Sequence, residues 1–287
     1  MSAVARPPSL PGARRTPAAG RLALYAVMVL LAAFYLVPVY IMLMTALKTF
    51  GQVQSTTPWV PALPPTLGNF GQSFGELSRP FFNSVELVVP ATLISAMLGS
   101  LNGYVLAKWR FRGSDLLFTL LLFGMFIPYQ SVLIPLVNTL ATLQLYGTIP
   151  GLVLVHVVYG IPITTLIFRN YYAAVPKELV EAARIDGASV LGVYRWVMFP
   201  LSVPAFVVVM IWQFTSIWNE FLFAVTIVNN PDSQPLTVAL ANMTGSVLHE
   251  YQLQMAGALI TALPPLLVYV LLGRYFIRGL LAGSLKG

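Results

Sequence analysis

Six stretches of this sequence are apolar for long enough to cross a lipid bilayer, and this limits the folds open to the chain. They run over about 22–47, 84–108, 116–136, 149–168, 201–228 and 255–272. A spanning helix needs about 20 predominantly apolar residues. Only 9% of the residues are charged, against about 25% in a typical soluble domain. We therefore predict an all-α integral membrane protein with six transmembrane helices.

The region before the first apolar stretch has a different character. Residues 1–20 are rich in proline and arginine, a composition typical of a disordered basic tail. The apolar stretch that follows is longer than the core of a signal peptide, so we interpret it as a helix that stays in the protein. The predicted domains are a tail over 1–20 and a transmembrane domain over 21–287.

A charged segment at about 169–200 separates the fourth and fifth apolar stretches. Charged side chains cannot lie in hydrocarbon without a partner, so this segment must face water or another protein. Glu181 and Arg184 are three residues apart and can pair on a helix. Gly187 is placed to end that helix in a left-handed conformation, and a second helical piece is expected over 189–198. Two interpretations remain open: a surface that a partner contacts, or an amphipathic helix pair that rests on the bilayer.

The basic residues fix the expected orientation. With six spans both termini lie on one side, and of the 16 Lys and Arg residues only Lys48 and Arg79 fall on the other side. Cytoplasmic loops carry the excess of basic residues, so we predict both termini and segment 169–200 to be cytoplasmic. The same distribution accounts for the net charge of +7 without a nucleic-acid partner.

Polar residues near the end of the fifth apolar stretch are candidates for a substrate pathway. Gln213, Ser216 and Glu220 share one helical face by their spacing, and Asn219 lies beside them. Their side chains can hydrogen-bond to the hydroxyl groups of a sugar. The alternative is that Glu220 lies at the outer interface next to Trp218, which would belong to an aromatic belt.

Small residues mark one face of the second apolar stretch. Ser95, Gly99 and Gly103 recur at four-residue spacing, which allows another helix to approach closely. We interpret the face as a packing surface, with sliding between helices as the alternative. His156 is alone in an apolar stretch, and we interpret it as a packed, hydrogen-bonded side chain rather than a ligand.

No arrangement of residues indicates catalysis, a metal site or a cofactor in this chain. The sequence contains no cysteine, which excludes disulfides and cysteine metal sites. It also contains no GxxxxGK[ST] phosphate-binding loop. We therefore expect a protein that is not an enzyme and does not itself bind ATP.

Several motifs resemble one family of membrane proteins. Glu181-Ala182-Ala183, Asp186-Gly187-Ala188 and Phe199-Pro200-Leu201 together resemble the EAA loop of membrane subunits from binding-protein-dependent ABC importers. Gly103-Tyr104-Val105-Leu106-Ala107 and Trp218-Asn219-Glu220-Phe221 resemble further motifs of the carbohydrate-importer branch. The resemblance covers most of residues 22–287 and is to subunits similar to the smaller permease of the maltose system.

The resemblance implies a fold and a set of partners. The fold would be that of a type I ABC importer permease in a prokaryotic inner or plasma membrane. The partners would be a second homologous permease, two ATPase subunits that hold ATP and magnesium, and an extracytoplasmic sugar-binding protein that faces loop 229–252. The C-terminal tail, 283–287, resembles tails that contact the ATPase. The residues matching the ATPase-coupling motif are Glu181, Ala182, Ala183, Arg184, Asp186 and Gly187.

The substrate and the mode of energy coupling are also expectations. Segments 146–151 and 274–281 look like those of glucose or mannose importer permeases, which implies a monosaccharide of that type or a small oligosaccharide. The alternative function is an ion-coupled secondary transporter that acts without an ATPase. Such a protein should show an inverted repeat and acidic coupling residues in mid-membrane, and neither is clear here.

Overall fold

The protein is built from helices of very unequal length. The computed structural model describes residues 18–109, 111–243 and 250–284, and forms no β-strand within them. The long helices are α1 (Ala18–Ala46), α3 (Gly68–Lys108), α6 (Ile149–Ala174), α10 (Val203–Trp218) and α13 (Tyr251–Ser284). The short ones are α2 (Phe50–Ser55), α4 (Ser114–Phe123), η1 (Gly124–Phe126), η2 (Tyr129–Val132), α5 (Leu133–Thr142), α7 (Lys177–Ile185), α8 (Val190–Val193), η3 (Tyr194–Met198), α9 (Phe199–Leu201), α11 (Leu222–Ile227), η4 (Pro231–Ser233) and α12 (Leu236–Asn242).

The predicted integral membrane class is confirmed by the described helices. Among them α1, α3, α6 and α13 are each long and apolar enough to cross a bilayer. Two further pairs of helices pass the same test together but are sharply bent. The number of spans reaches the predicted six if each bent pair crosses the membrane once.

The predicted third and fifth spans are not continuous helices. The segment expected as a helix over 116–136 divides into Ser114–Phe126 and Tyr129–Thr142, which meet at 92°. Pro128 lies between the two parts, and it has no N–H with which to continue a helix. The segment expected as a helix over 201–228 ends at Trp218 and resumes as α11.

The bend at the start of the fifth span also changes the expected cytoplasmic segment. Val190–Leu201 and Val203–Trp218 form a bent pair at 76°. Residues 190–200 of the charged segment therefore form one bent pair of helices with the fifth span.

Helix α3 begins well before its predicted start at residue 84. Gly, Pro, Ser and Thr are frequent in residues 48–83, a composition that favours a loop, but 68–83 are helical. Contacts with the rest of the chain outweigh that weak local preference. Ser73 donates a hydrogen bond to the Leu253 carbonyl (2.7 Å), and Leu77 is buried in the core.

The predicted packing face on α3 is confirmed. Gly99 and Gly103 lie against α6, where a Cβ on Gly103 would come within 2.7 Å of the Phe168 Cβ. A Cβ on Gly99 would clash with Thr164 in the same way. Small residues permit the backbones of two membrane helices to approach closely. The helices α3 and α6 therefore form the centre of the fold.

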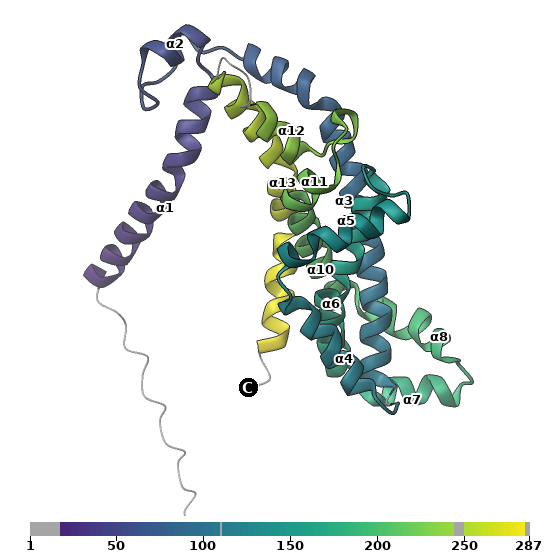
Figure 1. Cartoon of the computed structure of the whole chain (residues 1–287). Coiled ribbons are helices and arrows are strands. Elements are labelled where there is room, and N and C mark those ends of the chain that lie inside the picture. Colours follow the sequence, from purple (N-terminus) through teal and green to yellow (C-terminus); the bar gives the residue numbers. More distant parts are fainter. Residues whose placement is uncertain (1–17, 110, 244–249, 285–287) are drawn as a thin grey trace, which may run out of the picture.

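Helix α1 stands apart from the other helices except at its C-terminal end (Figure 1). Its large apolar side chains, such as Leu30 and Tyr35, are mostly exposed, an arrangement suited to a lipid environment. The predicted tail over 1–20 gives way to helix at Ala18, and residues 1–17 lie outside the described part of the chain.

Candidate functional site

The charged segment forms a helix, a sharp turn and a second helical piece, as predicted. Helix α7 ends at Ile185, and Gly187 adopts the left-handed conformation, with φ +84°. The Gly187 N–H donates to the Arg184 carbonyl (3.0 Å), and the Ala188 N–H donates to the Ala183 carbonyl (2.9 Å). This is the hydrogen-bond pattern of a Schellman cap, which satisfies the last carbonyl groups of a helix.

Most of the motif residues at this turn lie on the protein surface. Glu181, Ala182, Arg184, Asp186 and Gly187 are exposed. Ala183 differs from the other motif residues, because it is partly buried and packs against a core cluster. In Figure 1, α7 and α8 lie at the end of α3 opposite to α2.

The expected pairing of Glu181 with Arg184 is wrong. No ion pair joins them in the described part of the chain, and the Arg184 guanidinium lies 5.0 Å from the Trp109 ring centroid. A cation over an aromatic face is an alternative partner of comparable strength to a surface ion pair. It holds α7 against the end of α3.

A chain of buried hydroxyl groups connects this segment to the membrane helices. Tyr194 donates to the Ser100 Oγ (2.9 Å), which lies 2.7 Å from the Tyr172 hydroxyl, and Tyr172 donates to the Ser202 Oγ (2.9 Å). Ser202 donates in turn to the Phe199 carbonyl. Since a hydroxyl carries one hydrogen, Ser100 must be the donor to Tyr172, and every link then runs in the same direction.

This series of hydrogen bonds connects three elements and the junction between α9 and α10, which the sequence did not place together. Ser100 belongs to α3, Tyr172 to α6 and Tyr194 to η3, while Ser202 directly precedes α10. Tyr104 of α3 also donates to the Val190 carbonyl (2.9 Å). Element η3 is a π-helical turn, a distortion that often accompanies functional sites. The sequence shows that these residues are serines and tyrosines. It does not show that their hydroxyl groups contact one another, because those contacts depend on the tertiary fold.

We expect Tyr172→Phe to destabilise the protein by about 1–3 kcal/mol, because it removes one of the two hydrogen bonds of each buried serine: Ser100 loses its acceptor and Ser202 loses its donor. Thermal denaturation in mild detergent would measure the loss. Tyr171→Phe is the matched control, since the Tyr171 side chain is only partly buried and its hydroxyl donates to the Leu201 carbonyl, outside the chain of hydroxyl groups. Equal stability of the two variants would contradict the role of the hydroxyl chain.

A second candidate site is a cleft of about 600 Å³ between α6, α10 and α11. All four residues predicted for a substrate pathway line it: Gln213, Ser216, Asn219 and Glu220. The structure therefore brings them together as expected, and their contact with a substrate stays a prediction.

The four residues have different surroundings. Gln213 is only 3% exposed, and its amide donates to the Ser95 Oγ (2.9 Å) across the contact with α3. Gly160 makes room for it, since a Cβ there would lie 2.1 Å from the Gln213 Nε2. Ser216 and Asn219 are exposed. Gln213 is thus a packing residue, and its neighbours face the open cleft.

Glu220 caps the short helix α11. Its two carboxylate oxygens accept hydrogen bonds from the N–H groups of Phe223 (2.8 Å) and Ala224 (3.2 Å), which favours a negative charge at the start of a helix. The alternative of an interfacial Glu220 beside an aromatic-belt Trp218 does not fit. Trp218 is 2% exposed, and its indole N–H donates to the Thr261 carbonyl (3.0 Å).

His156 of α6 reaches the same cleft from the opposite side. It is buried as predicted, but its Nε2 makes no hydrogen bond within the described residues. This nitrogen lies 3.8 Å from a Glu220 carboxylate oxygen. The expectation of a hydrogen-bonded histidine is wrong for that atom, and the proximity to Glu220 could not be read from the sequence.

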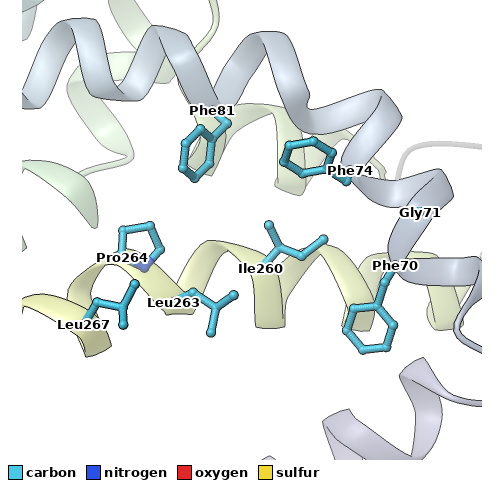
Figure 2. A pocket seen from close by; sticks show the side chains of 8 residues that line it. All are labelled: Phe70, Gly71, Phe74, Phe81, Ile260, Leu263, Pro264 and Leu267. Atoms are coloured by element: carbon cyan, nitrogen blue, oxygen red, sulfur yellow. The ribbon is translucent and has the colours of Figure 1, made fainter. Parts of the chain in front are cut away.

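A groove between α3 and α13 is a poor alternative as a sugar site. Figure 2 shows side chains of both helices around it, and its volume is about 530 Å³. The lining residues are all apolar: Phe70, Gly71, Phe74, Phe81, Ile260, Leu263, Pro264 and Leu267. A binding site for a polar molecule needs a few placed polar groups, which the cleft with Glu220 supplies.

Comparison with known proteins identifies related sequences. The family described as "Binding-protein-dependent transport system inner membrane component" matches residues 91–281, more than half of the chain. A "probable ABC transporter permease protein" of Pyrococcus horikoshii is 50% identical over 93% of this chain and 98% of its own length. The xylose/arabinose import permease protein of Haloferax volcanii is 38% identical over 91% and 92%.

A solved structure shares the fold. A chain in the crystal structure of a bacterial ABC transporter involved in the import of the acidic polysaccharide alginate superimposes with a TM-score of 0.78. The match covers 92% of this chain and 100% of that chain at 20% sequence identity. The predicted fold of an ABC importer permease is therefore confirmed.

Proposed function

Because the chain belongs to the family of binding-protein-dependent transport system inner membrane components, we propose that it is the permease subunit of an ATP-driven sugar importer. One observation carries the proposal. The outward-facing motif at the α7–α8 turn is connected through buried hydroxyl groups to α3, α6 and α10. Movement imposed on the turn is thereby passed to the helices that form the cleft.

The partners follow from the same assignment. Two ATPase subunits, which hold ATP and magnesium, lie on the cytoplasmic side of the membrane of a prokaryotic cell, and the α7–α8 turn contacts the ATPase. A second, homologous permease completes the path through the membrane, and an extracytoplasmic binding protein delivers the sugar. The basic residues on the α7–α8 side support this orientation. Residues 244–249 of the loop expected to face the binding protein, and 285–287 of the C-terminal tail, lie outside the described residues.

The proposal that the substrate is a sugar rests more on the names of related permeases than on the shape of the cleft. The Haloferax relative is named for xylose and arabinose, which are pentoses, whereas two segments of this chain resemble glucose or mannose permeases. A monosaccharide or a small oligosaccharide fits a cleft of about 600 Å³, since ligand pockets commonly span about 300–1,000 Å³.

The test is purification of the chain from its native membrane in mild detergent, followed by mass spectrometry. We expect an ATPase subunit and a second permease to copurify, and the purified complex to take up sugar into liposomes only with ATP and the binding protein. A chain that purifies alone and transports alone in liposomes would instead indicate an ion-coupled secondary transporter.

A further inference from the structure

The open wall of the cleft is a stripe of α10 that differs from the predicted one. Trp212, Ser216 and Asn219 line the cleft and are exposed, with Trp212 53% exposed. Their spacing places them on one face of the helix. Gln213, which the sequence placed in this stripe, is turned toward α3. The accessible wall therefore combines an indole ring with a hydroxyl and an amide.

More aromatic side chains surround this wall. Tyr129, Tyr159, Phe221 and Phe223 line the cleft, and the Phe223 ring contacts both tyrosine rings, with centroids 5.3 Å and 5.0 Å away. These contacts fix Phe223 among its neighbours and leave Trp212 as a large exposed ring. Aromatic surface with a few placed polar groups is the usual composition of a small-molecule site.

The cleft is lined by an acidic side chain but by no Lys or Arg side chain among the described residues. Glu220 is the acidic lining residue. The carboxylate is fixed by the α11 backbone, and its nearby basic group is His156 at 3.8 Å. Carboxylate oxygens only accept hydrogen bonds, so they suit hydroxyl donors and repel a second carboxylate at short range.

We propose that Trp212 is the stacking platform for an uncharged saccharide in this cleft, and that Glu220 excludes acidic saccharides from it. The C–H face of a sugar ring lies on the indole, while Ser216 and Asn219 hydrogen-bond to its hydroxyl groups. The inference rests on the proposed function and adds the class of sugar and the residue that contacts it.

The experiment measures sugar binding to the assembled importer in lipid nanodiscs by saturation-transfer NMR, with glucose, xylose and glucuronate as probes. We expect glucose or xylose to bind at least about tenfold more tightly than glucuronate. Trp212→Ala should weaken binding of the neutral sugars about tenfold, and Trp212→Phe, which keeps a ring, by no more than about threefold. Glu220→Gln should reduce the preference over glucuronate.

Trp196→Ala is the matched control, because Trp196 is also a well-exposed tryptophan, at 73%, but lies in η3, away from the cleft. It should bind the probes as the unmodified importer does. Unchanged binding by Trp212→Ala, or tighter binding of glucuronate by the unmodified importer, would overturn the inference.

Uptake into vesicles separates this inference from the function on which it rests. If the unmodified importer accumulates sugar with ATP but Trp212→Ala binds normally, only the platform is wrong. If no ATP-dependent sugar accumulation occurs at all, the proposed function fails, and the saccharide assignment fails with it.

Discussion

Replacing Gly187 with proline should reduce sugar uptake about a hundredfold or more while the importer still hydrolyses ATP. Gly187 has φ +84°, whereas proline is restricted to about −65° and has no N–H. The variant therefore loses the hydrogen bond to the Arg184 carbonyl and reorients α7 relative to α8. Parallel assays of ATP hydrolysis and uptake in liposomes would measure the uncoupling.

Two further variants make this result interpretable. Gly113 has φ +92° and, like Gly187, open space around it, so Gly113→Pro imposes similar strain outside the motif. It should retain much more uptake than Gly187→Pro. Gly187→Asn should retain most of the uptake, because asparagine tolerates the left-handed conformation better than other residues. Normal uptake by Gly187→Pro would show that the α7–α8 turn does not couple ATP hydrolysis to sugar uptake.

Replacing Gly103 with leucine should prevent stable folding. Any side chain at this position meets the Phe168 Cβ and the Arg169 backbone nitrogen, both 2.7 Å from the position of its Cβ. Overpacking usually costs about 1–3 kcal/mol, and here backbone atoms form part of the obstacle. Because lipid competes with helix contacts, we expect α3 and α6 to separate.

The yield of monodisperse protein and its thermal midpoint in detergent would measure this effect. Gly75→Leu is the control on the same helix, because a Cβ at Gly75 meets nothing within 4 Å. Similar midpoints for the two leucine variants would show that the contact between α3 and α6 is not the centre of the fold.

The sequence predicted those features that depend on local chemistry. Length and apolar content located the membrane helices, and the position of Gly187 predicted a left-handed cap that the structure contains. Spacing alone predicted the small-residue face of α3. Each of these depends on one short stretch of chain, so no knowledge of distant contacts was needed.

Features that depend on distant contacts were missed. Nothing local showed that 68–83 is helical, since Ser73 and Leu77 are held by the rest of the chain. Helical periodicity grouped Gln213 with Ser216 and Glu220, but the Gln213 amide donates a hydrogen bond to the Ser95 hydroxyl, which holds it against α3. The chain of hydroxyl groups through Tyr172 could not be predicted either, because its members are distant in the sequence.

Helix α3 is fastened to other segments of the chain near its middle and near its C-terminal end. Asn83 donates to the carbonyl groups of Asp232 (2.8 Å) and Gln234 (3.0 Å), while Ser100 and Tyr104 hold the α8–η3 region. About 30 Å of helix separates these attachments, at about 1.5 Å per residue. A tilt of about 10° at one end would displace the other by about 5 Å, close to one helical turn. Because α3 is continuous between these attachments, a tilt at one of them can be transmitted to the other along the helix, with no relay of side-chain rearrangements.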